Sequence, residues 1–496
     1  MKKKLLITIS LALLLIAFVS ATKTREIVST EVSAQTQNTD WPMWMHDPEH
    51  TGSTPATFTP TMGTANCQLT NTQDISPCIQ VRWKKSFNEW TNGLSQPIVV
   101  ANTVYLTNMN GHMYAYDTNT GTQRWDYAAG SPIYVTPALV EGKIFFGTFD
   151  GKIRAINASD KTELWTIQTG DRIMSSPVVV RENNILKVFI GSNDGKLYAV
   201  NGETGGVLFT YPVDYNSAVI SNPAYYQGKV FFAAENMYAY AVNTTTNQLA
   251  WKKKLAGEMN RHNHPIVISA SNTILFYSIP PHGDVGMGLK DKYFAYELLG
   301  GAGTPGGQTE RDLPPLLSDY QQQVLAHPET KSMHLFSTST GQEVTSFTAG
   351  SAQLSLIPLN NWYSNGQNYP LVVGNRDIIF SAFGGYILLN TATNQFSILE
   401  NYQFIRGDEY NGLILANGLL YGGFHANIAS LNISTKQRTQ LHGCKDCGEP
   451  YATFDPTTPA NHWGGYTGDG YTNNGQYFTV ANGRAFQFIN GNFYAF

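Results

Sequence analysis

The chain has 496 residues and a formal net charge of −4, so it has no excess of basic side chains and we expect no nucleic-acid partner. Only 14% of its residues are charged and 12% are aromatic. In a typical soluble domain about 25% of the residues are charged. This composition is typical of β-rich extracytoplasmic proteins, because strands favour aromatic and β-branched side chains.

The N-terminus has the pattern of a secretory signal. Lys2, Lys3 and Lys4 precede an apolar run over residues 5–19, and a small-residue cleavage site follows at Ala21. We therefore expect a signal peptide over residues 1–21, which would extend to residue 34 if the second small-residue site is used. A membrane anchor is the alternative, but the run is short for a spanning helix.

The remaining chain has no apolar stretch of transmembrane length, so no transmembrane segment is expected after signal cleavage. No cysteine follows the apolar run before Cys67, which argues against a lipoprotein anchor. The expected location is therefore extracytoplasmic, either secreted or periplasmic.

Four cysteines in an exported chain predict disulfides. Cys67 and Cys78 bracket a polar loop, and Cys444 and Cys447 form a CxxC pair, so pairing within each set is the favoured interpretation. Redox activity would need a βαβ setting that the sequence lacks. Zinc binding by all four cysteines is an alternative, although the spacing of Cys67 and Cys78 is poor for a zinc finger.

From about residue 95 the sequence repeats at intervals of about 40 residues, which is the period of a propeller blade. A proline opens an apolar run in each unit, at Pro97, Pro137, Pro177, Pro223 and Pro265. A large aromatic residue recurs at nearly the same interval, at Trp83, Trp125, Trp165, Phe209 and Trp251. Between them lie Asn-Gly or Asp-Gly dipeptides, which tolerate the positive φ of a two-residue hairpin turn.

Four short antiparallel strands in each repeat predict an all-β propeller rather than a sandwich, which would not repeat so regularly. The expected blades cover 95–130, 136–170, 175–213, 221–255, a fifth from His264 that resumes at Met333, 371–404 and 412–442. An insertion at about 281–331 interrupts the fifth blade. It is rich in glycine, which favours a lid or partner-contact loop.

The two ends of the chain predict how the ring closes. Residues 488–496 match the stretch that ends at Tyr116, with Asn490-Gly491 falling on Asn110-Gly111, so the last blade is one strand short. The segment around Trp83 has the pattern of a fourth strand and is expected to complete this blade, which removes an exposed sheet edge. An eight-bladed propeller over residues 81–496 follows, with residues 22–80 as an N-terminal extension and lead-in loop; seven blades is the alternative.

Residues 115–125 read Ala-Tyr-Asp-Thr-Asn-Thr-Gly-Thr-Gln-Arg-Trp and resemble the tryptophan-docking repeat A-x-D-x-x-T-G-x-x-x-W. That repeat marks the pyrroloquinoline quinone (PQQ) propellers and their non-enzymatic relatives, including BamB-type assembly proteins. The opening Trp-Pro-Met-Trp-Met-His-Asp-Pro-Glu-His-Thr-Gly over 41–52 also resembles the lead-in of secreted propellers of this group. A large indole on the outer strand can pack against the backbone of the neighbouring blade. We therefore expect the tryptophans of the repeat to dock blades and not to bind a ligand: Trp83, Trp125, Trp165 and Trp251.

Strands alternate in direction within a blade, so blade-to-blade connections and the loops from second to third strand emerge on one face. Every long excursion falls on such a connection, at 256–264, 280–331, 351–370, 405–411 and 443–476. Loops that a rigid scaffold supports carry function disproportionately. The candidate ligand-binding residues on these loops are Arg261, His262, His264, His282, Asp284, Arg406, Asp408, Glu409, His462, Trp463 and Asp469.

Carboxylates and imidazoles at such a rim could bind a cation or a polar ligand. The alternative for each candidate residue is that its side chain only hydrogen-bonds to the backbone of its loop and keeps the surface hydrated. The cluster around Arg406, Asp408 and Glu409 is the best of them, because an inter-blade segment skirts the channel. His262 and His264 alone do not make a metal site.

The sequence favours a monomeric binding or scaffold protein whose loop-rich face takes a protein, a glycan or an envelope component, with no cofactor. The lack of a lipidated cysteine departs from the BamB-type pattern and argues against an outer-membrane assembly role. The alternative is a PQQ- and calcium-dependent dehydrogenase that oxidises an alcohol or sugar, with Asp408 or Asp469 as the base. The adjacent cysteines of the alcohol-oxidising branch are absent, and the family's calcium ligands have no match by position. A hydrolase is disfavoured, because no carboxylate pair has a defined separation.

Overall fold

A computed structural model describes residues 39–59, 80–87, 95–256, 264–278, 333–344, 347–349, 352–354, 370–382, 385–391, 395–400, 413–424, 427–440, 478–489 and 492–496. Residues 39–496 form one compact unit. The expected signal peptide, the four cysteines and the insertion at 281–331 lie outside the described residues. In the described part, no helix is long and apolar enough to cross a membrane.

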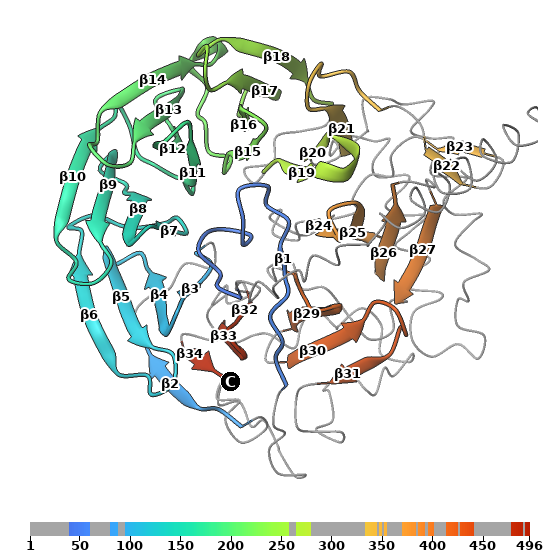
Figure 1. Ribbon diagram of the computed structural model, residues 1–496, viewed down its shortest axis with the longest axis horizontal. Helices are drawn as coiled ribbons and strands as arrows, with labels where there is room; N and C mark the ends of the chain where they lie inside the picture. The colour runs from blue at the N-terminus through green and yellow to red at the C-terminus, as the bar shows by residue number, and fades with distance from the viewer. Residues whose placement is uncertain are drawn as a thin grey trace, which may run out of the picture. The chain divides into compact units, whose positions relative to one another are not determined.

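The unit consists of eight antiparallel sheets arranged as blades in a ring (Figure 1). Blades 1 and 2 consist of β3 (Ile98–Val100), β4 (Thr103–Thr107), β5 (His112–Asp117) and β6 (Gln123–Ala128), then β7 (Ala138–Val140), β8 (Lys143–Gly147), β9 (Lys152–Asn157) and β10 (Glu163–Gln168). Blades 3 and 4 consist of β11 (Val178–Glu182), β12 (Ile185–Ser192), β13 (Lys196–Asn201) and β14 (Val207–Pro212), then β15 (Ala224–Tyr226), β16 (Lys229–Ala234), β17 (Tyr238–Asn243) and β18 (Leu249–Lys254).

The second half of the ring is less regular. Blades 5 and 6 consist of β19 (Ile266–Ile268), β20 (Thr273–Tyr277) and β21 (Met333–Ser337), then β24 (Leu371–Val373), β25 (Asp377–Ala382), β26 (Gly385–Asn390) and β27 (Gln395–Glu400). Blades 7 and 8 consist of β28 (Ile414–Ala416), β29 (Leu419–Phe424), β30 (Asn427–Asn432) and β31 (Arg438–Gln440), then β32 (Thr479–Ala481), β33 (Arg484–Ile489), β34 (Asn492–Ala495) and β2 (Trp83–Ser86). A short β1 (Ser53–Thr54) joins blade 7, and β22 (Phe347–Ala349) and β23 (Ala352–Leu354) form a separate hairpin.

In blades 1 to 3, the tight turns between second and third strands lie at the Asn-Gly and Asp-Gly dipeptides that predicted them. Gly111 closes the turn of blade 1 with φ 83°, and a Cβ at this position would lie 2.7 Å from the Ser131 carbonyl oxygen. A residue with a side chain would therefore be strained both in its backbone and against its neighbour. This is why an Asn-Gly dipeptide marks the turn.

The ring closes between the two ends of the described chain. Strand β2 pairs antiparallel with β34, with Lys84 opposite Tyr494, and the Arg82 amide donates to the Ala495 carbonyl over 2.8 Å. The innermost strands β3, β7, β11, β15, β19, β24, β28 and β32 contact one another in that order, and β32 contacts β3 again. The prediction of eight blades closed by an N-terminal strand is confirmed, and the seven-blade alternative is excluded.

The outer strands reach the neighbouring blade through their tryptophans. The indole Nε1 of Trp165 donates to the Gly202 carbonyl of blade 3 over 3.0 Å, and its ring covers Gly205, where a Cβ would lie 2.8 Å from the indole. Trp83, Trp125 and Trp251 donate likewise to carbonyls in the third-to-fourth-strand turns of blades 1, 2 and 5.

A β-bulge precedes this aromatic residue in blades 1 to 4, where the pairing of the third and fourth strands shifts register. In blade 2 the shift lies between Glu163 and Trp165. A bulge bends its strand and redirects side chains, so the repeated bulge aims each aromatic ring at the next blade.

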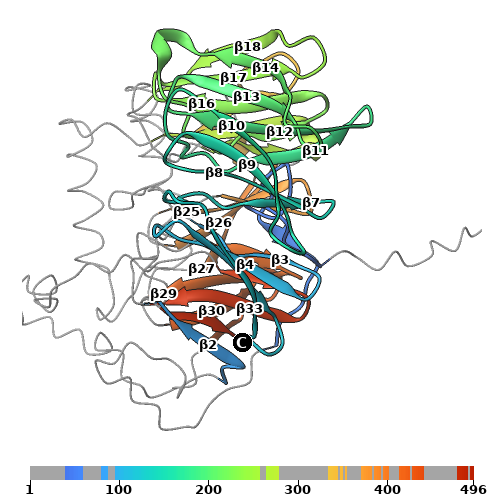
Figure 2. The same cartoon turned by 90° about the vertical axis from the view of Figure 1, so that its left-hand side faces the viewer.

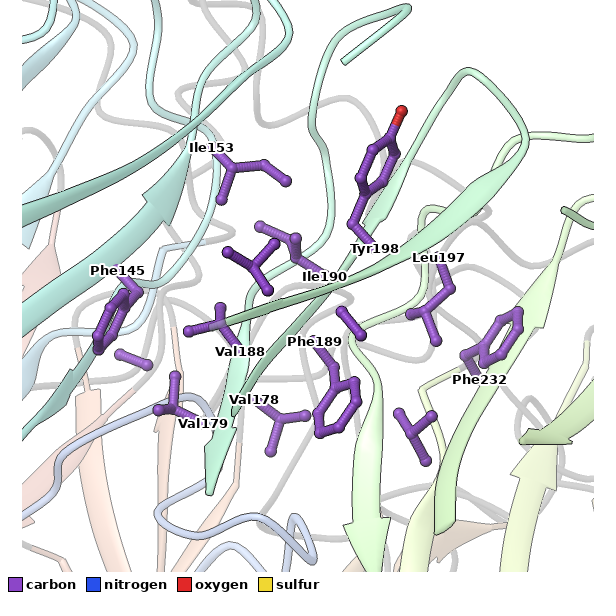
Figure 3. Close-up of a cluster of buried hydrophobic side chains, with 14 of the residues drawn as sticks. Phe145, Ile153, Val178, Val179, Val188, Phe189, Ile190, Leu197, Tyr198 and Phe232 are labelled. Carbon is purple, nitrogen blue, oxygen red and sulfur yellow. The ribbon is translucent and has the colours of Figure 1, made fainter. Parts of the chain in front are cut away.

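Apolar side chains fill the space between neighbouring blades (Figure 3). Phe145 of blade 2, Phe189 of blade 3 and Phe232 of blade 4 are all fully buried in one cluster. Full burial of a side chain of this size stabilises the fold by about 1.5–3 kcal/mol. In the side view of Figure 2, blades 1 to 4 lie one beside the next in this way.

Replacing one docking indole tests this packing. We expect Trp165→Ala to lower the free energy of unfolding by about 3–5 kcal/mol, because it removes a buried ring and opens a cavity over Gly205. The neighbouring Leu164 is 41% exposed in the bulge, so Leu164→Ala should cost less than about 0.5 kcal/mol. Denaturant unfolding followed by circular dichroism measures both, and equal losses would contradict the docking role.

Candidate functional site

The channel of the propeller is filled by the chain's own lead-in, residues 39–54, drawn in blue at the centre of Figure 1. Each innermost strand presents an edge to the channel, and buried edge N–H groups need acceptors. Lead-in carbonyls accept from the middle residue of the innermost strand in six blades. The pairs are Trp41 with Val99, Pro42 with Leu139, Pro48 with Tyr225, Glu49 with Val267, Thr51 with Val372 and Gly52 with Leu415, at 2.7–2.9 Å.

The lead-in enters and leaves by one face. The Thr39 carbonyl accepts from Asn482 and the Asp40 carboxylate accepts from Ala101, both in first-to-second-strand turns. At the other end, the Thr54 carbonyl accepts from Asn417 in the corresponding turn of blade 7. We call this side the opposite face. The other side, where blade-to-blade and second-to-third-strand connections emerge, is the loop-bearing face.

A tight carboxylate-centred turn shapes the middle of the lead-in. The Asp47 Oδ1 accepts the amides of Glu49 and Thr51 at 3.1 Å each, and His46 Nδ1 lies 3.1 Å from Oδ2. Burial alone would raise the pKa of Asp47, but the hydrogen bond and charge of His46 and the hydrogen bonds from Thr51 outweigh it and lower that pKa. The carboxylate is thereby engaged within its own turn.

Trp44 lies at the centre of the lead-in between two imidazoles. Its ring centroid is 4.6 Å from that of His50 and 4.6 Å from that of His264, both in edge-on geometry. His50 Nδ1 lies 2.9 Å from the Pro265 carbonyl, so this nitrogen carries the hydrogen. Burial lowers the pKa of His50 to about 4, so the ring is neutral at neutral pH.

A belt of five buried side chains links the starts of blades 1 to 5. Each backbone amide donates to the side chain of the equivalent residue in the next blade: Gln96 to Thr136 Oγ1, Thr136 to Ser176 Oγ, Ser176 to Asn222 Oδ1, and Asn222 to His264 Nδ1, at 2.6–3.0 Å. The Gln96 side chain also accepts from the Met45 amide over 2.8 Å. We call Gln96, Thr136, Ser176, Asn222 and His264 the belt.

His264 is the one predicted ligand-binding residue that the structure describes. It is 4% exposed, and its Nδ1 accepts a backbone amide, so the ring is held as a neutral, Nε2-protonated imidazole inside the belt. The other candidates, Arg261, His262, His282, Asp284, Arg406, Asp408, Glu409, His462, Trp463 and Asp469, lie outside the described residues. The same is true of Cys67, Cys78, Cys444 and Cys447.

Sequence reasoning missed the belt and the burial of the lead-in. The belt had a signal, because each member directly precedes one of the recurring prolines Pro97, Pro137, Pro177, Pro223 and Pro265. Within the described residues, no group of three or more His, Cys, Asp and Glu side chains could hold a metal ion.

The strand bounds place the long connections on the loop-bearing face. The intervals from β18 to β19, β27 to β28 and β31 to β32 are blade-to-blade connections, and the interval from β20 to β21 joins a second to a third strand. The turns of the opposite face are short in all described blades. The lead-in therefore fills the channel from the opposite face up to the belt. The mouth of the channel on the loop-bearing face lies on the other side of the belt.

Comparisons with known proteins agree with this architecture. Residues 79–276 match the family model described as outer membrane protein assembly factor BamB. No curated protein matches the sequence.

Three solved structures illustrate the likeness. A europium-containing methanol dehydrogenase is 13% identical, with 81% of this chain and 85% of that chain covered and a TM-score of 0.51. The computationally designed Ika8 protein is 12% identical, with 83% and 98% covered and a TM-score of 0.50. BamB from Moraxella catarrhalis is 15% identical, with 66% and 81% covered and a TM-score of 0.43. At such identities the likeness shows the fold alone.

The buried imidazole of His50 predicts a pH-dependent stability. Its pKa is about 4 in the folded chain against an ordinary 6.5, so the unfolded chain binds the proton first and stability falls as pH drops from 6.5 towards 4. The loss should reach about 3 kcal/mol. His50→Asn keeps a donor near the Pro265 carbonyl and tolerates the φ of 60°.

Melting temperatures of both proteins between pH 7 and pH 4.5 measure this effect. His50→Asn should be less stable than the original protein at pH 7, because it loses the contact with Trp44, yet it should show a flatter pH dependence. Parallel pH profiles for the two proteins would show that His50 does not carry the effect.

If His264 acts as a member of the belt, two substitutions at this position should lower the free energy of unfolding by different amounts. His264→Phe leaves the buried Asn222 amide without an acceptor and should cost about 1–3 kcal/mol. His264→Asn should cost less, because Asn222 already performs the same role towards Ser176. Thermal unfolding of the two variants decides the matter, and a larger loss in His264→Asn would count against the belt role.

Proposed function

We propose that this chain, whose residues 79–276 match a PQQ-type propeller family model, is an extracytoplasmic binding protein whose partner docks on the loop-bearing face. One observation supports this most: the two faces of the same ring are built differently. The opposite face carries short turns and both ends of the lead-in, whereas the intervals from β18 to β19, β20 to β21, β27 to β28 and β31 to β32 start and end on the loop-bearing face.

The proposed rim of the site consists of candidates on these connections, with Arg406, Asp408 and Glu409 foremost. They belong to the interval between β27 and β28, which runs from the outer strand of blade 6 to the innermost strand of blade 7. A blade-to-blade connection of this kind begins at the outer edge of one blade and ends beside the channel. His264 is not part of this proposal, because its Nδ1 accepts a backbone amide in the belt.

The dehydrogenase alternative has less support from the described residues. A PQQ–calcium site needs a group of carboxylate and amide ligands, and within the described residues no group of three or more His, Cys, Asp and Glu side chains could hold a metal ion. The polar belt atoms at the mouth of the channel are engaged with each other and with Met45. We therefore derive no redox step from the described residues.

The extracytoplasmic location rests on the N-terminal pattern of residues 1–21. Cleavage after Ala21 or after Ala34 would leave residues 39–54 attached to the propeller. Either position is therefore compatible with a filled channel.

Photo-crosslinking from both faces tests the proposed function. The photoreactive residue p-benzoylphenylalanine is placed at Asp408 in one variant and at Asn184, an exposed residue of the opposite face, in another. After irradiation of the source cells, we expect a discrete adduct from position 408 and none from position 184. Adducts from position 184 alone, or equally from both positions, would contradict binding through the loop-bearing face.

A further inference from the structure

The described half of the loop-bearing face carries a set of accessible apolar and cationic side chains. They occupy blade-to-blade connections and second-to-third-strand turns of blades 1 to 4. All are half-buried except Arg172 and Tyr215, which are exposed. We call them the docking arc: Met109, Tyr134, Phe149, Arg172, Met174 and Tyr215.

The centre of the docking arc is continuous. The rings of Tyr134 and Phe149 lie 5.7 Å apart, and the Arg172 guanidinium lies over Phe149 at 6.0 Å from its centroid. The side-chain Nδ2 of Asn193 donates to Met174 Sδ over 3.8 Å. Backbone hydrogen bonds hold these segments in place, from the Phe149 amide to the Pro132 carbonyl and from the Asn193 amide to the Arg172 carbonyl, each 3.0 Å long. The arc is therefore a preformed surface.

Tyr215 stands at one end of the docking arc with 91% of its surface exposed. Its φ of 62° is in the left-handed region, which a bulky residue rarely adopts. The turn is anchored on both sides, because the Val213 amide donates to the Gly195 carbonyl over 2.9 Å and Lys252 forms a 2.5 Å ion pair with Asp214. An anchored turn thus exposes an aromatic ring to solvent. Backbone strain of the kind seen at Tyr215 clusters at functional sites.

The same blades provide an internal comparison. Their turns on the opposite face are shorter than the blade-to-blade connections, and apart from Ala101 and glycines their exposed residues there are polar or charged; they include Asn102, Asn119, Thr120, Glu141, Asp160, Lys161, Asn183, Asn184, Glu203, Thr204, Gln227, Thr245 and Thr246. Turn residues of this kind meet the needs of the fold without apolar side chains. The docking arc is therefore not a requirement of blade construction.

We propose that the docking arc binds a protein that presents an apolar side chain next to a carboxylate. This assignment rests on the proposed function and names the class of its partner. Met, Phe, Tyr and Arg are the residue types enriched at protein interfaces. Within the described part of the chain, no carboxylate lies within ion-pair distance of the Arg172 guanidinium, so a carboxylate of the partner complements it.

A glycan fits this surface less well, because sugar recognition needs polar side chains with free hydrogen-bonding capacity. Two of the polar side chains beside the docking arc, Asp194 and Asn236, are already engaged. Asp194 accepts from the Gly170 amide, the Lys196 amide and the Tyr198 hydroxyl. Asn236 donates to the Asp214 carbonyl and to Tyr240 and accepts from the Tyr238 amide.

The test starts from the full-length protein with p-benzoylphenylalanine at Met174. We expect irradiation of the source cells to give an adduct with one protein, which mass spectrometry identifies and which is then purified. Its dissociation constant is measured against the original protein and variants. Phe149→Ala and Arg172→Glu should each weaken binding by about 10-fold or more, whereas Arg172→Lys should weaken it less, since it keeps the charge and loses only the planar stacking.

Matched controls separate binding from folding. Asn184→Ala and Lys161→Ala, on the opposite face, should leave the dissociation constant unchanged. The Arg172, Asn184 and Lys161 variants should melt within about 2 °C of the original protein, because only exposed contacts change. Phe149 is half-buried, so binding by Phe149→Ala is measured at a temperature at which its unfolding curve shows it folded.

The outcomes distinguish the two proposals. Adducts from position 408 but none from position 174 would overturn the docking arc and leave the proposed function standing. Adducts from position 184 alone would overturn both. A polysaccharide adduct at position 174, or unchanged binding by both Phe149→Ala and Arg172→Glu, would overturn the assignment of a protein partner.

Discussion

The unpaired inner edges of the eight blades are the constraint on which this structure depends. A propeller gives each innermost strand one neighbour within its sheet and an open edge towards the channel, where a backbone N–H has no water to meet. Carbonyls of the lead-in supply acceptors to Val99, Leu139, Tyr225, Val267, Val372 and Leu415. Each hydrogen bond is modest, at about 0.5–1.5 kcal/mol, but an unmade one in a buried site costs more. The lead-in is therefore as much a part of the fold as any blade.

The outer half of each blade follows a different principle. There the bulge and the indole of Trp165, together with the glycine that it covers, form one unit that is repeated from blade to blade. Phe209 of blade 3 occupies the same place without an indole N–H. The outer contacts are thus local and interchangeable, whereas the inner contacts depend on a single segment of irregular backbone.

This difference explains what could be predicted from the sequence. Blade number, strand order and the closing pair around Trp83 followed from spacing, because the prolines, tryptophans and Asn-Gly turns repeat with the blades. The burial of Trp44 and His50 did not, because the lead-in has no periodicity and its contacts are spread over strands hundreds of residues away. His264 was predicted to bind a ligand because it lies on the long connection over 256–264, but its Nδ1 accepts the Asn222 amide and its place before Pro265 is that of a belt residue.

The lead-in also explains why the two faces of the ring differ in the length of their connections. Residues on the opposite face are held to short turns because the lead-in must pass there and hydrogen-bond to Asn482, Ala101 and Asn417. No such restriction acts on the loop-bearing face, where connections can lengthen without disturbing a hydrogen bond of the channel. Insertions tolerated on one side only are a route by which a symmetric scaffold gains a single functional side.

The order of the chain also bears on how the molecule assembles. The next strand after the residues that fill the channel is β2, and β2 completes a sheet whose other strands come from the last residues of the sequence. This is the most distant pairing in sequence that the ring contains, and such pairings form slowly. A nascent chain emerging from a ribosome or a translocation pore therefore holds its core segment early but keeps one sheet edge open until the final strand appears, and for that interval it depends on protection from aggregation or proteolysis.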